Sequence, residues 1–262
     1  MKPGTLIAAT VAGATTLAAF PAAAQPAAEV STGAEYQEGD YGTGERVETL
    51  TVDNRVRVES GGLFLFASLP WRRIEAPGNV VGGGGLLGLP IIIDPTRPGG
   101  REVREGIGDL RLGGGYRLPR VAGFELALTG ELKLPTASAS RGIGTGEIDV
   151  AAGAEASRTF GAITPFVGIS YTIPGDPEGY ELRDSLAARG GLLARLAPGL
   201  HGTFTYGYSQ SLSPLLADEQ QVSTALDVAL SGRMSLGLHG SAGLSAGAAD
   251  FGAGVRLGWR MF

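Results

Sequence analysis

Apolar and polar residues alternate along most of this chain. Between Ser235 and Ala246, for example, Leu236, Leu238 and Leu244 share one parity, while His239 and the neighbouring serines share the other. Side chains two residues apart on a β-strand point to the same face, whereas an α-helix would scatter these leucines around its surface. The pattern therefore predicts a strand with one apolar face and one small polar face.

The same period of two recurs in twelve segments, so the predicted fold class is all-β and antiparallel. The segments are residues 29–39, 46–58, 61–75, 104–118, 121–134, 145–158, 162–174, 181–196, 200–212, 219–231, 234–246 and 250–262. Their boundaries are expected to hold to about 2 to 4 residues. Beyond the N-terminal region no apolar run reaches the roughly 18 residues of a transmembrane helix.

The connections between these segments fall into two sets that alternate along the chain. The longer set is residues 42–44, 76–103, 135–144, 175–180, 213–218 and 247–249, and the tight set is 60–61, 119–120, 161, 198–199 and 232–233. Short turns at one end and longer loops at the other are typical of an outer-membrane barrel. An even number of strands also returns both termini to the same side.

We expect the apolar face of these strands to point outward, towards lipid. Alternation alone also fits a soluble barrel or sandwich. About eight strands already enclose a lumen that side chains can fill, so twelve would leave a soluble interior too wide to pack. A lumen tolerates charge that a bilayer excludes. The polar face carries Asp53, Arg55, Arg57, Asp109, Arg111, Glu125, Glu131, Lys133, Glu147, Asp149, Glu155, Arg183, Arg189, Asp227 and Arg256. The prediction is a transmembrane antiparallel up-and-down β-barrel of about twelve strands.

The N-terminal residues predict export. Met1 and Lys2 precede a small, apolar stretch that ends at Phe20, and three alanines at 22–24 form a signal-peptidase pattern. We expect residues 1–24 to be a signal peptide and residues 25–262 to be one barrel domain. A membrane anchor is the weaker alternative, because the apolar core falls short of the roughly 20 residues that a spanning helix needs.

Composition narrows the partners. The chain has no cysteine and a formal net charge of −5. The absence of cysteine excludes disulfides, thiolate metal sites and thiol nucleophiles. The negative net charge disfavours nucleic acid as a partner. The terminal Phe262, on an amphipathic last segment, resembles the assembly signal of outer-membrane proteins. We expect the outer membrane of a diderm bacterium as the location. The expected partners are outer-membrane lipid and lipopolysaccharide, the barrel assembly machinery and a small-molecule substrate.

Three short motifs occur in a fixed order with hairpin spacing. They are Gly106-Ile107-Gly108-Asp109, then Lys133-Leu134-Pro135-Thr136, then Gly142-Ile143-Gly144-Thr145-Gly146 followed by Asp149. Together they resemble the outer-membrane transporter family named for the meta-pathway of phenol degradation. The resemblance extends over most of the chain after residue 24 and implies a barrel for small molecules, hydrophobic or aromatic ones among them. It does not fix a substrate.

The same residues supply a candidate lumen or selectivity site. A turn at Pro119–Arg120 would place Asp109 opposite Glu131, with Arg111 and Lys133 on the diagonals, and we add Asp149 to this set of candidates. Such a charge cluster either stiffens the barrel wall or tunes passage through the lumen. Both alternatives stay open at this point.

The connection at residues 76–103 exceeds the roughly 12 to 15 residues of ordinary structureless loops. It holds an apolar string that would be costly to expose to water, including Leu86, Leu87, Ile91, Ile92 and Ile93. We hypothesise that it folds into the barrel mouth as a gating loop, a constriction or an apolar way in for substrate. The alternative is a loop that packs against lipopolysaccharide or a partner.

An enzyme is not expected, and no cofactor is expected. The two histidines, His201 and His239, fit polar positions on strands better than a general base. Two histidines without cysteine also make a zinc site improbable. The composition thus favours a pore or transporter for passive passage of small molecules. The rival interpretation is a closed structural or adhesin-like barrel without transport.

Overall fold

The computed structural model describes residues 10–11, 14–15, 26–82, 91–97 and 99–261. Most of the predicted signal peptide, residues 1–24, and the terminal Phe262 lie outside the described residues. Two short strands in the N-terminal region, β1 (Thr10–Val11) and β2 (Ala14–Thr15), pair with each other. The described residues contain no helix long and apolar enough to cross a membrane.

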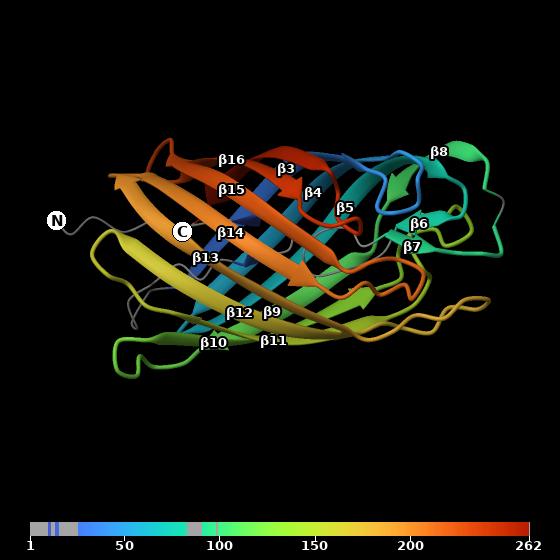
Figure 1. Cartoon of the computed structure of the whole chain (residues 1–262). Helices are drawn as coiled ribbons and strands as arrows, with labels where there is room; N and C mark the ends of the chain where they lie inside the picture. The colour runs from blue at the N-terminus through green and yellow to red at the C-terminus, as the bar shows by residue number, and fades with distance from the viewer. Residues whose placement is uncertain (1–9, 12–13, 16–25, 83–90, 98, 262) are drawn as a thin grey trace.

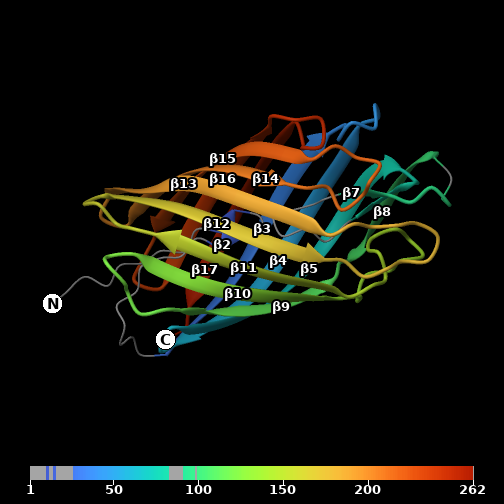
Figure 2. The ribbon, with the colours of Figure 1, turned by 60° about the horizontal axis from the view of Figure 1, so that its bottom comes forward.

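The rest of the chain folds into a closed antiparallel barrel (Figures 1 and 2). Its strands are β3 (Ala27–Gly39), β4 (Val47–Ser60), β5 (Leu63–Pro77), β8 (Arg101–Ile107), β9 (Leu110–Arg117), β10 (Glu125–Leu134), β11 (Asp149–Ser157), β12 (Ile163–Ile173), β13 (Ser185–Ala197), β14 (Leu200–Ser209), β15 (Glu219–Ala229), β16 (Met234–Gly243) and β17 (Phe251–Arg260). Sequential strands pair with each other, and pairing of β17 with β3 closes the ring. The predicted segments are confirmed, with small differences at their ends.

One wall strand is interrupted. Both β8 and β9 pair with β5, so the two together count as one strand and the described wall has twelve. The register against β5 shifts by one residue at the break, because Ile107 lies opposite Trp71 whereas Arg111 lies opposite Ser68. This is the geometry of a β-bulge, which bends a strand and re-aims its side chains. The sequence predicted one continuous strand here.

The two ends of the barrel differ as the connection lengths predicted. The start of β3 and the end of β17 pair through Glu29 and Arg260, so both lie at one end. Residues 61–62, 118–124, 158–162, 198–199 and 230–233 connect strands at that end. Residues 40–46, 78–82, 91–97, 99–100, 135–148, 174–184, 210–218 and 244–250 lie at the other end, which we call the loop end. Within the longest loop, β6 (Val80–Gly82) pairs with β7 (Ile91–Ile93).

The predicted turn at Pro119–Arg120 is wrong. The chain reverses at Ala122 and Gly123, which have φ values of 51° and 82°. The flanking residues Val121 and Phe124 exchange two backbone hydrogen bonds. A two-residue hairpin turn with positive φ at both central positions matches the twist of the strands that it joins. The shift moves every pairing between β9 and β10 but leaves each side chain on its predicted face.

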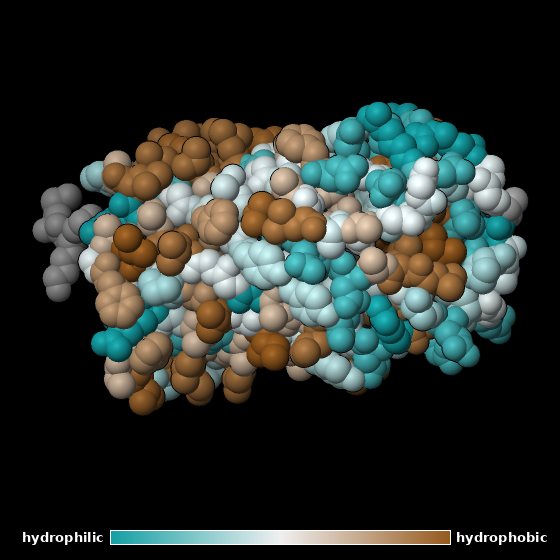
Figure 3. Space-filling model, viewed as in Figure 1, coloured by the Kyte–Doolittle hydropathy of each residue, from teal (hydrophilic) through white to brown (hydrophobic). Residues whose placement is uncertain are grey.

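The outer surface of the barrel is apolar (Figure 3). Large apolar side chains that are more than two-fifths exposed project outward from almost every strand, as the alternation predicted. They include Val56, Leu65, Leu128, Val150, Val167, Ile169, Leu192, Phe204, Leu226, Leu238 and Leu257. Hydrophilic residues gather instead over the loop end in the same view. An apolar surface of this extent is incompatible with water and fits a lipid environment.

Substitutions on one strand test the lipid contact. Ile169, in the middle of β12, and Ile163, at its start, face outward and are 52% and 48% exposed. We expect Ile169→Arg to lower the free energy of unfolding in lipid vesicles by about 2–4 kcal/mol and Ile163→Arg by only about 0–1 kcal/mol, because the cost of charge rises towards the bilayer midplane. Urea titrations would measure both. Equal costs at the two positions would show that lipid does not cover this face.

Candidate functional site: the charged lumen

Charged side chains on the inner face of the strands form ion pairs along the barrel wall. Because residues of one parity face inward on every strand, oppositely charged residues of the same strand, of adjacent strands or of strands separated by one other meet there. The ion pairs include Arg57–Glu59, Arg117–Glu59, Arg111–Glu131, Arg189–Glu155, Arg256–Asp227 and Lys133–Asp149. Two residues predicted for the lumen, Glu147 and Arg183, lie instead in loops at the loop end.

Three of the five predicted site residues form one buried cluster near the loop end. Lys133 lies opposite Asp149 in the register, and its Nζ is 2.7 Å from Asp149 Oδ2 and 3.8 Å from Asp109 Oδ2. The same Nζ donates a hydrogen bond of 3.0 Å to Thr145 Oγ1. All four side chains are buried. We call Asp109, Lys133, Thr145 and Asp149 the loop-end cluster.

The loop-end cluster holds loops to the barrel wall. Asp109 accepts a hydrogen bond from the Ala137 N–H (3.0 Å), and Asp149 accepts one from the Gly175 N–H (3.1 Å). Each acceptor is on the wall and each donor is in a different loop. The arrangement supports the wall-stiffening alternative for these three predicted residues.

The three sequence motifs meet at the interruption between β8 and β9. The Thr136 hydroxyl donates to the Gly108 carbonyl (2.9 Å) and accepts the Leu110 N–H (2.8 Å), so it spans the bulge. A Cβ on Gly144 would lie 2.7 Å from Asp109 Oδ2, which leaves room only for glycine. The motifs thus have a common structural task, which is to brace the one broken strand of the wall.

The other two predicted residues, Arg111 and Glu131, lie deeper in the lumen. The predicted pairing of Asp109 with Glu131 is wrong, because the displaced turn sets Lys133 opposite Arg111 and Glu131 opposite Gly113. Arg111 Nη1 nevertheless lies 3.6 Å from Glu131 Oε1. The sequence therefore identified the lumenal face of these residues and the contact between Arg111 and Glu131, but not the register of the strands.

Arg111 and Glu131 separate two cavities in the lumen. Arg111 lines a cavity of about 110 Å³ against β3, β4, β5, β16 and β17, which we call the arginine cavity. Glu131 lines a cavity of about 50 Å³ against β10 to β13, which we call the alanine cavity. A second contact joins the two, because Arg55 of the arginine cavity lies over the ring of Phe66 of the alanine cavity at 4.8 Å. We call Arg55, Phe66, Arg111 and Glu131 the partition.

Two phenylalanines inside the barrel escaped the sequence prediction. Phe64 is 1% exposed and Phe66 lies two residues further on the same inner face. Their rings lie flat against glycines of β9, since a Cβ on Gly115 would be 2.6 Å from Phe64 Cζ and one on Gly113 would be 2.4 Å from Phe66 Cζ. Glycine in a strand commonly marks such a close approach. The run Gly113–Gly115, near a strand with aromatics at alternate positions, was the available signal.

The predicted gating loop contributes to a small apolar core at the loop end. Ile91 packs with Val80, Ile74 and residues of other loops, and Ile92 is fully buried. The Arg104 guanidinium donates to the carbonyl of Val80 and ties the same hairpin to the wall. Ile93 packs against this core, whereas Leu86 and Leu87 lie outside the described residues. A role in gating stays a prediction.

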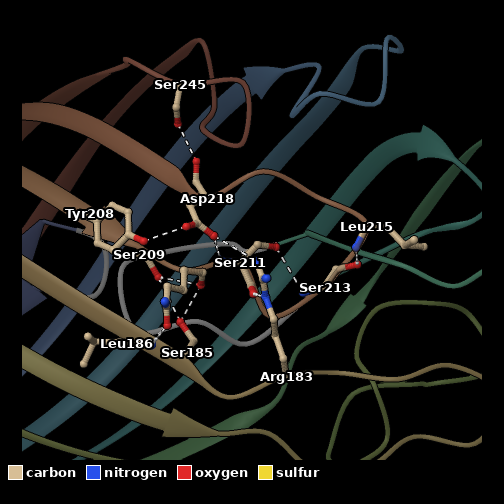
Figure 4. Close-up of polar contacts among 11 residues, drawn as sticks. Arg183, Ser185, Leu186, Tyr208, Ser209, Ser211, Ser213, Leu215, Asp218 and Ser245 are labelled. Carbon is tan, nitrogen blue, oxygen red and sulfur yellow. Dashed lines mark hydrogen bonds and ion pairs between the residues drawn. The ribbon is translucent and has the colours of Figure 1, made fainter.

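A polar network fixes the neighbouring loop before β15 (Figure 4). Asp218 accepts hydrogen bonds from the Arg183 Nη2 (3.0 Å), the Tyr208 hydroxyl (2.7 Å) and the Ser211 N–H (3.1 Å). The Ser245 hydroxyl donates to the Asp218 carbonyl. Burial alone would raise the pKa of Asp218, but the Tyr208 and Ser211 hydrogen bonds and the Arg183 charge outweigh it and lower that pKa.

The two histidines lie on strands, His201 on β14 and His239 on β16. His201 pairs in register with Asp227 and Arg195, and its Nε2 is buried without a hydrogen-bond partner there. His239 Nε2 lies 3.5 Å from Glu35. Within the described ranges, no three His, Cys, Asp or Glu side chains are grouped to hold a metal ion.

Comparison with solved structures identifies the architecture. A KdgM porin superposes with a TM-score of 0.54 at 7% sequence identity, over 88% of this chain and 98% of the porin. A NanC porin superposes with a TM-score of 0.50 at 8% identity, over 87% of this chain and 97% of the porin. No family model and no curated protein sequence matches the chain. The fold is that of outer-membrane barrels, and with its apolar outer surface it places the chain in the outer membrane of a Gram-negative bacterium.

The structural role of the loop-end cluster can be measured. Lys133→Met leaves Asp109 and Asp149 buried without their cation, so we expect it to lower the free energy of unfolding by about 3–5 kcal/mol. Arg46→Met is the control, because Arg46 pairs with Glu38 and Glu48 but its side chain is 59% exposed. An ion pair of exposed side chains contributes little to stability, so Arg46→Met should be close to neutral. A similar small loss in both variants, followed by urea titration, would contradict the role assigned to Lys133.

Proposed function

We propose that the barrel is a passive pore for small molecules. One observation carries the proposal: the lumen of the closed barrel is lined by charged and hydroxyl side chains and contains two cavities separated by a thin partition of four side chains. An inner face filled for stability alone would need no cavities lined by buried charge, because burying charge is costly. A lumen of this kind is suited to the passage of polar and amphipathic solutes.

The finer proposal is that hydrophobic or aromatic molecules are among the solutes. Phe64 and Phe66 place two aromatic rings on the inner face, and an apolar core that includes Ile91 lies at the loop end. These features agree with the transporter family that the three motifs resemble, and we propose that membership as well. We further propose lipopolysaccharide and the barrel assembly machinery as partners, and no catalytic activity.

A closed barrel is the second candidate function. The partition and the apolar core at the loop end both occupy space that a solute would have to cross. A closed barrel would serve as a structural or adhesin-like protein of the outer membrane. Conduction separates the two candidates directly.

Purified protein in planar lipid bilayers tests the pore. We expect discrete conductance steps, and a larger unitary conductance for Phe66→Ala, because this change removes a ring from the partition. Leu65→Ala is the matched control, since Leu65 is the adjacent residue on the outer face and is 51% exposed. Its unitary conductance should equal that of the wild type. Insertion without any current, in the wild type and in Phe66→Ala, would favour the closed barrel.

A further inference from the structure

The arginine cavity gathers buried polar atoms that lack a partner. Arg55 Nε, Thr49 Oγ1 and His239 Nε2 are buried and have no hydrogen-bond partner among the described residues. All three residues line this cavity. Buried polar atoms in folded proteins are nearly always satisfied, and those that are not often mark the place of a water or a ligand. These three atoms therefore point to an occupant of the arginine cavity.

The charge of the cavity wall selects an anion. Four guanidinium groups line the cavity, against the two carboxylates of Glu35 and Asp53; they belong to Arg55, Arg72, Arg111 and Arg256. Neutral donors already engage both carboxylates, because Glu35 accepts a hydrogen bond from Gln37 (2.8 Å) and Asp53 accepts one from Ser68 (2.5 Å). The carboxylates that pair with Arg111 and Arg256, on Glu131 and Asp227, are not part of the lining.

Arg55 is the guanidinium best prepared for a ligand. The Arg55 Nε is 3.8 Å from Asp53 Oδ2, which is too long for a hydrogen bond. The Arg55 guanidinium lies over the Phe66 ring, which holds it from one side. Its N–H groups, along the edge of the guanidinium, remain the atoms that can bind a ligand. A guanidinium edge matches a carboxylate, which can accept two parallel hydrogen bonds from it.

The size of the cavity fits a small solute. Its volume of about 110 Å³ exceeds what a single water needs, which is on the order of 10–15 Å³ by this measure. The hydroxyls of Ser31, Thr49 and Thr51 add neutral hydrogen-bonding groups to the wall. A carboxylate could thus be held by the Arg55 guanidinium, while the rest of the molecule extends along the cavity.

We propose that the arginine cavity is a binding site for the carboxylate of a small organic acid, with Arg55 as its ligand. The inference deepens the proposed pore function and rests on it, because it names the class of solute that the lumen favours.

Equilibrium dialysis of the full-length protein in detergent, with labelled benzoate as the probe, tests the site. We expect benzoate to bind at least about tenfold more tightly than benzamide, its neutral analogue, because charge-assisted hydrogen bonds require the carboxylate. Arg55→Gln should weaken benzoate binding by about tenfold or more, and Arg55→Lys should restore part of it, since lysine keeps the charge but loses the planar fork.

Arg57→Gln is the matched control. The substitution removes the same charge as Arg55→Gln, two residues further along the same strand. Arg57, however, lines the alanine cavity and pairs with Glu59. It should leave benzoate binding unchanged. Arg55→Lys is the second test variant, should Arg55→Gln fail to fold by circular dichroism, because it keeps the charge and should still bind benzoate less tightly than the wild type. The proposal would be overturned if benzoate did not bind or bound no more tightly than benzamide. It would also be overturned if Arg55→Gln and Arg57→Gln weakened benzoate binding equally.

The dialysis measurement does not depend on conduction, so the two proposals can fail separately. Benzoate binding without current in planar bilayers would retain the site and refute the pore. Current without benzoate binding would retain the pore and refute the site. If the pore and the site both exist, benzoate should reduce the wild-type current at concentrations near its dissociation constant. The Arg55→Gln current should fall only at benzoate concentrations about tenfold higher.

Discussion

The structure depends on one constraint, which is that a backbone surrounded by lipid must satisfy its hydrogen bonds within the protein. A sheet can do this only by closing, and here β3 pairs with β17 on one side and with β4 on the other, so that the ring has no free edge. Closure forces alternate side chains into two different solvents. The period of two in the sequence is the direct consequence of that division.

Closure also explains why the lumen holds so many charges. Twelve strands enclose more space than aliphatic side chains fill, and long charged side chains reach across it to meet partners on other strands. Arg256 and Asp227 pair in this way, as do Arg189 and Glu155. Aromatic rings fill the rest of this enclosed space where the neighbouring strand has glycine, as Phe66 does beside Gly113. The gaps between these groups are the two cavities.

The sequence predicted what depends on parity and missed what depends on register. Strand segments, faces and the two ends of the barrel follow from alternation and loop length, and the structure confirms them. The turn at Ala122–Gly123 displaced the pairing of Asp109 and Glu131, yet the displacement is an even number of residues, so no side chain changed face. The bulge between β8 and β9 and the stacking of Arg55 on Phe66 depend on contacts between distant strands, which no local pattern records.

The five charged residues singled out by sequence divide into groups with different physical tasks. Lys133 is surrounded by two carboxylates and a hydroxyl, all buried and all engaged, so this cluster has no capacity left for a solute. The charges of Lys133, Asp109 and Asp149 compensate one another within the wall. This suits a cluster that holds loops in place. Arg111 instead stands at the border of a cavity, beside Arg55, whose Nε has no partner among the described residues. Unsatisfied hydrogen-bonding capacity at a cavity wall is what a permeating molecule could use, and for that reason we propose the partition, and not the loop-end cluster, as the place of selectivity.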